Sequence, residues 1–187
     1  MNDSLRSTLT AVAGLANAYL ENLGRRGDDW LVLTSPVDHD GKPNAVARDK
    51  IVMAVHNLTQ ETVLSTHAAV RPGGAAFATT APPLYLDVHL VFVANFEPSK
   101  YADGLAALSR LIGFFQQTPV FTPQTMPGLA PEIDKIALQL ENLDPADVRH
   151  VTDMLGVPYR PSVFYKLRML PFTSAAIRSP ADPVAPG

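Results

Sequence analysis

The chain has 187 residues, of which 47% are hydrophobic and 18% charged, with a formal net charge of -3 and no cysteine. Such a chain can bury one ordinary hydrophobic core, so we expect one domain rather than two. The lack of cysteine excludes disulfides, thiolate metal ligands and a cysteine nucleophile, and the scattered basic residues argue against nucleic acid as a partner. No apolar run approaches the ~18 residues of a membrane span, and polar residues interrupt the N-terminal segment, so we expect neither membrane insertion nor a signal peptide.

The first elements follow from hydrophobic periodicity. Apolar residues recur at three- and four-residue steps over 5–23, which predicts an amphipathic helix closed by Gly24. The runs WLVLTS at 30–35 and KIVMAVHNL at 50–58 predict two strands joined by a long loop rich in turn-forming residues. Residues 60–83 are rich in small residues, glycine and proline and lack periodicity, so we expect a mobile loop or arm there.

The stretch PPLYLDVHLVFVANF at 82–96 alternates with period two, which predicts a long strand. One of its faces is purely apolar, whereas the other carries Asp87 and His89. Residues 97–117 predict a helix that starts near Pro98. The expected buried stripe of this helix is Tyr101, Leu105, Leu108, Ile112 and Phe115.

The last third of the chain predicts two strands around a short helix. Residues 134–142 have high helix propensity, but their apolar and polar residues alternate, so we predict a strand. Asp144 is expected to cap a helix over 145–155, with Gly156 behind it. The run SVFYKLRML at 162–170 predicts a last strand with a cationic outer face.

Taken together, these elements predict an α+β fold. We expect a single domain with a mixed or mostly antiparallel sheet of about five strands, covered on one face by about three helices. This domain is assigned to residues 1–172. The proline- and alanine-rich residues 173–187 cannot bury enough apolar surface to order themselves, so we expect a flexible tail.

Asp87 and His89 are the first candidates for chemistry because they lie two residues apart on one strand face. They could act as an acid-base pair if a nucleophile lay nearby, and Ser65 or Ser162 would have to approach His89 in such a hydrolase. Nothing in the spacing supplies that third group, so we predict that neither serine does. We favour a solvated or interface face of the sheet, on which basic residues of the last strand are cross-strand partners.

Two further motifs suggest metal or phosphate sites, and we reject both. DHDG at 38–41 places carboxylates around an imidazole but lacks the later ligands of a calcium loop, so a polar loop tip is expected. RPGGAA at 71–76 lacks the lysine of a phosphate-binding loop. The histidines show no paired spacing typical of zinc; they are His39, His56, His67, His89 and His150. We therefore expect no metal ion, no cofactor and no enzymatic activity.

Three stretches, in the same order along the chain, carry a family resemblance. They are PPLYLDVHLVFVANF at 82–96, YADGLAALSRLIGFFQQTPVF at 101–121 and MLGVPYRPSVFYKLRML at 154–170. On the basis of these stretches, the chain resembles the N-terminal domain of the cap proteins of extracellular contractile injection systems. The resemblance extends from the first helix to about residue 172. These are phage-tail-like particles of the antifeeding-prophage and Photorhabdus-virulence-cassette type. The resemblance implies a tail terminator, a small α/β subunit that forms a six-fold ring on the distal end of the inner tube and sheath and stops their growth.

The resemblance also implies the partners. These are further copies of the chain in a hexameric ring, the inner tube protein and the sheath protein, with no nucleic acid and no membrane. The protein would be cytoplasmic during assembly and then part of the injection particle. By residue type and expected exposure, the candidate interface residues are Arg71, Phe121, Lys166 and Arg168. A soluble non-enzymatic adaptor that binds partner strands at a sheet edge stays open as an alternative, and the oligomeric state distinguishes the two.

Overall fold

The computed structural model of the chain describes residues 3–23, 27–61, 70–73, 76–80, 84–130, 133–172 and 177–181. The helices among them are α1 (Ser4–Leu23), η1 (Ala45–Ala47), η2 (Pro98–Lys100), α2 (Tyr101–Gln117) and α3 (Pro145–Met154), of which η1 and η2 are 3-10 helices. The strands are β1 (Leu31–Leu33), β2 (Lys50–Gln60), β3 (Val70–Gly73), β4 (Ala76–Thr80), β5 (Leu84–Asn95), β6 (Val120–Phe121), β7 (Ile136–Glu141), β8 (Ser162–Phe172) and β9 (Ile177–Ala181). None of these helices combines the length and the apolar composition needed to cross a membrane.

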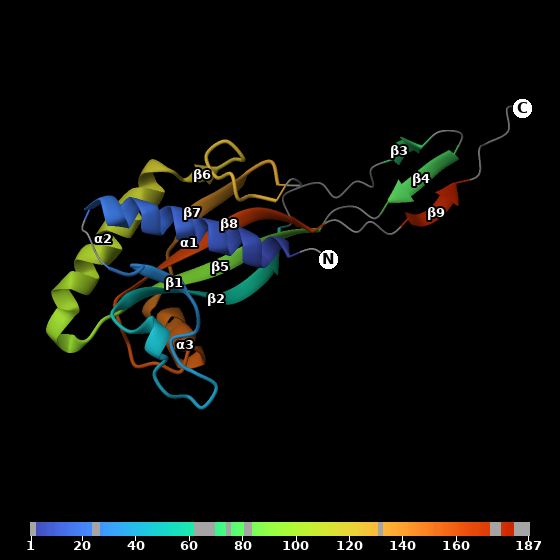
Figure 1. Cartoon of the computed structure of the whole chain (residues 1–187). Coiled ribbons are helices and arrows are strands. Elements are labelled where there is room, and N and C mark those ends of the chain that lie inside the picture. The colour runs from blue at the N-terminus through green and yellow to red at the C-terminus, as the bar shows by residue number, and fades with distance from the viewer. Residues whose placement is uncertain are drawn as a thin grey trace, which may run out of the picture.

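Six of the described strands form the main sheet, in the order β1-β2-β5-β8-β7-β6 (Figure 1). β1 runs parallel to β2, and every other neighbouring pair in this sheet is antiparallel. The long strands β2, β5 and β8 lie in the middle, and the short strands β1 and β6 form the edges. The predicted α+β class with a mixed, mostly antiparallel sheet is confirmed, with more strands than expected.

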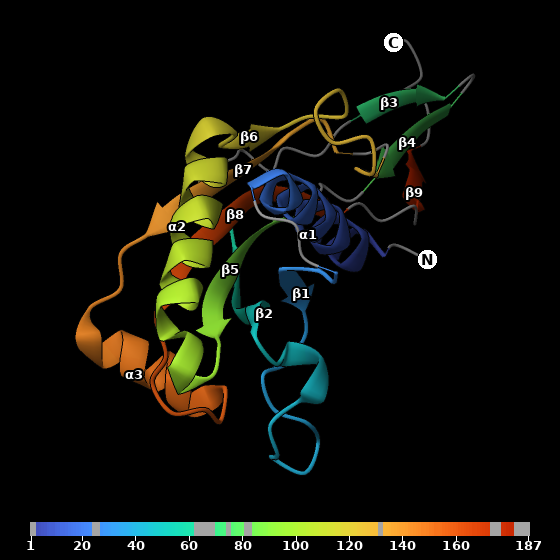
Figure 2. The same ribbon diagram turned by 60° about the vertical axis from the view of Figure 1, so that its left-hand side comes forward.

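Helices α1 and α2 cover one face of the main sheet (Figure 2). Four residues of the predicted apolar stripe of α1 are buried, namely Leu9, Val12, Ala16 and Leu20, and Leu5 and Tyr19 are partly buried against the same core. The apolar face of β5 lies beneath the helices. Tyr19 of α1 contacts Phe114 of α2 with ring centroids 5.1 Å apart. This face therefore holds the larger hydrophobic core.

The predicted buried stripe of α2 is wrong for three residues. Tyr101, Leu105 and Ile112 are 54%, 42% and 38% exposed. The buried residues of α2 are Gly104, Ala107, Leu108, Leu111, Phe114 and Phe115. A Cβ atom at Gly104 would lie only 3.1 Å from the ring of Phe96, so the helix approaches the sheet through its smallest residue. This close approach, which periodicity alone does not report, decides which face of α2 is buried.

Helix α3 packs on the opposite face, so the expectation that all helices cover one face is wrong. Its Val151 packs with Val91 and Val93 of β5 in a second, smaller core. The start of α3 is as predicted, because the side chain of Asp144 accepts hydrogen bonds from the first backbone N–H groups of the helix. Gly156 follows the helix with a φ of +68°, which suits a residue without a Cβ atom.

A second sheet with the order β3-β4-β9 joins two segments that are distant in sequence. Both neighbouring pairs in it are antiparallel. In the main sheet Gln60 lies opposite Leu86, and Leu84 lies opposite Phe172, so the chain leaves and re-enters the main sheet at one end for both segments. These three strands lie within the segments for which a mobile arm and a flexible tail are predicted, and the mobility of both stays a prediction. The rest of residues 62–83 and 173–187 lies outside the described residues.

Candidate functional site

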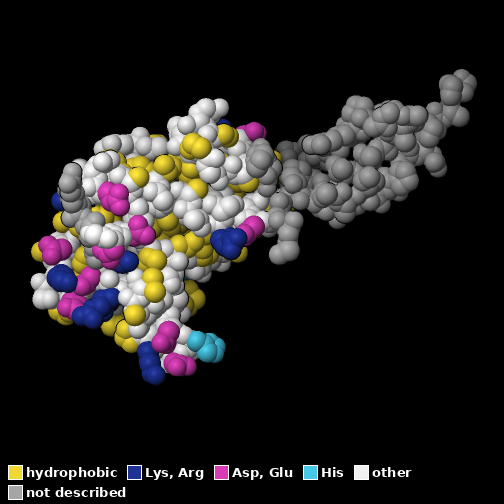
Figure 3. Space-filling view, viewed as in Figure 1, with side chains coloured by type: hydrophobic (Ala, Val, Ile, Leu, Met, Phe, Trp, Pro, Cys, Tyr) yellow, Lys and Arg dark blue, Asp and Glu magenta, His cyan; other side chains and the backbone are white. Residues whose placement is uncertain are grey.

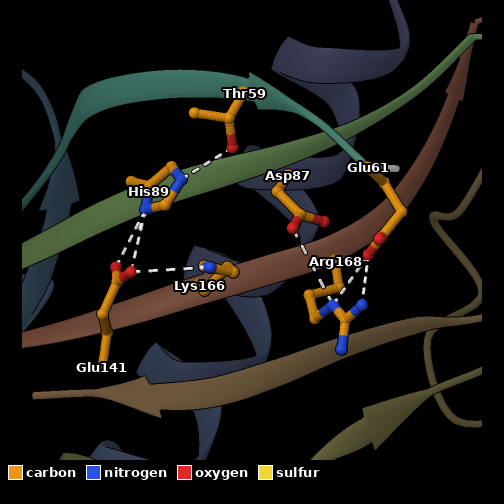
Figure 4. Close-up of polar contacts among 7 residues, drawn as sticks. All are labelled: Thr59, Glu61, Asp87, His89, Glu141, Lys166 and Arg168. Atoms are coloured by element: carbon orange, nitrogen blue, oxygen red, sulfur yellow. Dashed lines mark hydrogen bonds and ion pairs between the residues drawn. The ribbon is translucent and has the colours of Figure 1, made fainter. Parts of the chain in front are cut away.

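The sheet face on which α3 packs also carries a row of polar side chains (Figure 4). We call this set the polar row; it consists of Thr59, Glu61, Asp87, His89, Glu141, Lys166 and Arg168. On β5 it continues the alternation that places Val91 and Val93 in the smaller core. Asp87 and His89 are nevertheless only 7% and 8% exposed. Of the two readings, a solvated or an interface face, the solvated one is wrong for Asp87 and His89, because neighbouring polar side chains cover them. The interface reading stays a prediction.

Two β-bulges flank this part of β5. In β2 the register shifts between Val55 and Asn57, which makes His56 the extra residue. In β8 the register shifts opposite Asp87, where Met169 adopts a φ of +68°. Bulges redirect side chains and are frequent beside functional sites. The bulge in β2 moves Thr59 onto the face of the polar row, opposite Asp87, whereas His56 and Arg168 lie on that face by regular alternation with Ala54 and Phe164.

Arg168 joins two buried carboxylates at one end of the polar row. Its Nε donates to Oε2 of Glu61 at 2.9 Å, its Nη2 donates to the same oxygen, and its Nε lies 3.8 Å from Oδ2 of Asp87. Burial raises the pKa of Asp87, the charge of Glu61 raises this pKa further, and Arg168 and Lys166 oppose both effects. The predicted cross-strand pairing of Asp87 with Arg168 is confirmed, and the cluster links the end of β2 with β5 and β8.

His89 is held at both ring nitrogens. Its Nε2 lies 2.9 Å from Oγ1 of Thr59, and its Nδ1 lies 2.9 Å from Oε2 and 3.1 Å from Oε1 of Glu141. Lys166, which lies opposite His89 in the register, places its Nζ 3.6 Å from Oε1 of Glu141. These contacts tie β2, β5, β8 and β7 together across the face of the sheet.

His56 lies beside this cluster, and one of its two ring nitrogens has no hydrogen-bond partner among the described residues. Its ring centroid is 5.8 Å from those of His89 and Phe164. The Nε2 atom is buried and has no hydrogen-bond partner within the described part of the chain. Burial lowers the pKa of His56, and the neighbouring His89 lowers this pKa further, so the ring is held neutral near pH 7.

The hydrolase hypothesis fails at Ser162. This residue pairs with Val93, whereas His89 pairs with Lys166 four positions further along β8. At ~3.3 Å per residue the serine lies about 13 Å from the position opposite His89. The prediction that Ser162 does not approach His89 is confirmed, and Ser65 lies outside the described residues.

The four candidate interface residues have different surroundings. Phe121 is fully buried and contacts Phe114 with ring centroids 6.2 Å apart, so its expected exposure is wrong. The side chains of Lys166 and Arg168 are 31% and 30% exposed, and both are engaged in the polar row. The backbone of Arg71 lies in β3, and its side chain is outside what the structure describes.

The DHDG motif forms the exposed tip of the loop between β1 and β2, as predicted. Oδ1 of Asp38 accepts hydrogen bonds from the backbone N–H groups of Asp40 and Lys42 at 3.0 and 2.8 Å. Figure 3 shows side chains of both charges and a histidine gathered at this tip. The Asp38 carboxylate therefore stabilises the loop itself.

Sequence reasoning missed His56, Glu61 and Glu141 as members of this region. His56 and His89 are 33 positions apart, and Glu141 lies on β7, which β8 separates from β5. The strand order of the main sheet brings them together. No local spacing in the sequence reports that proximity.

Comparison with known proteins agrees with the sequence resemblance. Among solved structures, the chain is similar to the PVC sheath/tube terminator of an extracellular contractile injection system in its extended state, with a TM-score of 0.64 and 10% identity, over 100% of this chain and 62% of that chain. It is also similar to the tube terminating cap of the anti-feeding prophage, with a TM-score of 0.63 and 12% identity, over 95% of this chain and 57% of that chain. At these identities the likeness concerns the fold, and the chain spans about three fifths of each of those proteins. The search of curated proteins gives no match.

The family assignment rests on the sequence. The family model of the Pvc16 N-terminal domain matches residues 7–185, which is nearly the whole chain. That range includes the three stretches on which the resemblance was based, together with the main sheet, the polar row, α2, α3 and all but the first turn of α1. The protein is therefore a member of the Pvc16 N-terminal domain family.

Proposed function

We propose that this protein is a terminator subunit, which binds the growing end of the tube and sheath of a contractile injection particle and stops their polymerisation. The observation that carries this proposal is the likeness of the fold to two proteins described as a sheath/tube terminator and a tube terminating cap. Membership of the Pvc16 N-terminal domain family supports it. The role is structural and requires no catalytic group.

The mechanism we infer is thermodynamic capping by a closed ring. The end of a polymer exposes the contact surface that the next layer of subunits would bind. Six copies that contact one another head to tail would close into a ring, and such a ring can cover this surface while presenting no copy of it. Growth then stops because the next layer has nothing to bind.

The sheet edges suggest where contacts between subunits form. The main sheet ends in β1 and β6, which have three and two residues, so its edges offer little backbone for strand addition. In the second sheet, β3 and β9 each pair with β4 alone among the described strands. Their outer edges can accept a strand from a neighbouring copy, from the tube or from the sheath. We therefore assign the second sheet as a contact arm.

The test is to assemble purified tube and sheath proteins with increasing amounts of this protein and to measure polymer length by negative-stain electron microscopy. A terminator shortens the polymers when it is scarce relative to tube subunits, because the number of ends sets the amount required. An adaptor that binds along the sides of the tube would act only when its molar amount approaches that of the tube subunits. Binding that saturates only at that higher ratio, without an effect on length, would contradict the proposal.

A truncated variant separates the two sheets in this assay. A chain ending at Phe172 keeps every strand of the main sheet and removes β9. If the second sheet is the contact arm, this variant should stay folded, as judged by circular dichroism, and should lose most of its effect on length. Full activity of the folded variant would assign the contact to the main sheet instead.

A further inference from the structure

Three side chains from three strands of the main sheet converge beside the polar row. His56 of β2, His89 of β5 and Glu141 of β7 each offer one ligand atom, and these atoms all lie within 4.8 Å of one another. We propose that they form a binding site for a divalent transition-metal ion, with Zn²⁺ as the best match. Imidazole nitrogens suit Zn²⁺ and its neighbours, whereas Ca²⁺ and Mg²⁺ prefer oxygen ligands.

The contacts of His89 suit a metal ligand. Its Nδ1 faces Oε2 of Glu141 at 2.9 Å, which is a few tenths of an ångström less than the ~3.3 Å between two tetrahedral ligands of zinc. A small adjustment of the Glu141 side chain admits the ion between them. When Nδ1 binds the metal, Nε2 carries the proton and donates to Oγ1 of Thr59, 2.9 Å away. Such a partner for the second nitrogen fixes the tautomer and orientation of metal-binding histidines.

His56 provides the independent observation. Its Nε2 is buried and has no hydrogen-bond partner within the described residues, which is unfavourable for a polar atom. His56 is the extra residue at the bulge in β2, and its ring lies nearly perpendicular to that of Phe164, with centroids 5.8 Å apart. A metal ion shared with His89 and Glu141 would satisfy this nitrogen.

Lys166 is the one cation among the described residues that contacts these ligands, and its position leaves room for a metal ion beside Glu141. Its Nζ lies 3.6 Å from Oε1 of Glu141, whereas the closest contact of His89 is to Oε2. One carboxylate can therefore face the lysine and the metal with different oxygens. Three protein ligands leave the fourth position of a tetrahedral ion to water. The bound ion would link β2, β5 and β7 and stabilise the sheet, whether or not the protein is a terminator.

The experiment measures binding of Zn²⁺ to the full chain by isothermal titration calorimetry at pH 7.5, with Co²⁺ absorption as a probe of tetrahedral coordination. We expect one ion per chain. At metal concentrations of about 100 times Kd, the melting temperature should rise by about 5–10 °C. The variants H56F and E141Q should each weaken binding at least about 10-fold, since each removes a ligand. The matched control is H150N, which changes an exposed histidine on α3 whose side chain is 74% exposed, and it should bind like the unaltered protein.

The outcomes separate cleanly. Failure of the unaltered chain to bind either metal would overturn the proposal. So would a Kd that is unchanged in H56F, or a loss of binding confined to H150N. H56F is the decisive variant, because no described hydrogen bond of the Nε2 atom is lost and an aromatic ring is kept beside Phe164.

Discussion

Replacing Arg168 by methionine should destabilise the protein strongly, because the substitution removes the cation shared by two buried carboxylates. The side chains of Glu61 and Asp87 are only 3% and 9% exposed, so neither can regain its water without opening the sheet. Removing one partner of a buried ion pair costs about 3–5 kcal/mol. The Arg168 side chain is itself 30% exposed, which favours the lower end of that range, about 3 kcal/mol. Methionine keeps an unbranched apolar chain, so the loss comes from the charge and its hydrogen bonds.

The assay is urea unfolding followed by the fluorescence of Trp30, the single tryptophan, and by circular dichroism. The midpoint should fall in R168M while the m-value stays unchanged. The double variant with E61Q should lose less stability than R168M alone, because the buried side chain that loses its hydrogen bonds to Arg168 is then uncharged. A loss below about 1 kcal/mol in R168M, or strict additivity of the two substitutions, would refute the reasoning.

Three further predictions concern other parts of the fold. Asp144→Ala should cost about 1 kcal/mol in urea unfolding, since two N–H groups in the first turn of α3 lose their acceptor; an unchanged midpoint would contradict the cap. Phe121→Ala should cost about 3–5 kcal/mol because the ring is fully buried, whereas Val120→Ala beside it, at a residue 44% exposed, should change stability by less than about 0.5 kcal/mol; similar losses would contradict the burial. The carboxylate of Asp49 accepts hydrogen bonds from Lys100 and from the backbone N–H of Glu97, and these bonds hold its pKa below the ordinary value of 3.8. The ionised carboxylate therefore stabilises the fold above pH 3.8, and this contribution is lost as the pH falls through the folded-state pKa. Asp49→Asn should therefore cost about 1 kcal/mol at pH 7, and its difference from the unaltered protein should shrink below about pH 4; a difference that grows on acidification would contradict the sign.

The elements that sequence predicts correctly are those whose pattern is local. Residues 136–141 show this most clearly, because alternation identified β7 although helix propensity was high. Asp144 and Gly156 identified the two ends of α3 correctly, because helix capping and a positive φ depend only on residues within a few positions. Such features need no knowledge of the rest of the fold.

The errors arise where contacts between distant segments decide the structure. The buried face of α2 is set by the approach of Gly104 to Phe96, although Tyr101 and Ile112 are larger apolar residues. The second sheet forms because β4 pairs with β9, about 100 positions away, and residues 60–83 show no periodicity from which to infer it. Tertiary context overrides local preference in both cases.

The candidate site divides in the same way. The proximity of Asp87 and Arg168 could be anticipated from the expectation that two strands with polar faces pair. The convergence of His56, His89 and Glu141 could not, because it depends on the strand order, which places β8 between β5 and β7. Alternation in KIVMAVHNL places His56 on the same face as Val52 and Ala54, but it does not report which strands lie beside that face.

The most direct test of the terminator proposal is the length distribution of injection particles made by cells with and without this protein, measured by electron microscopy. Terminator function predicts particles of uniform length in its presence, and tubes and sheaths of variable, extended length in its absence. Restoring the protein should restore the uniform length. Particles of unchanged, uniform length without the protein would contradict the account.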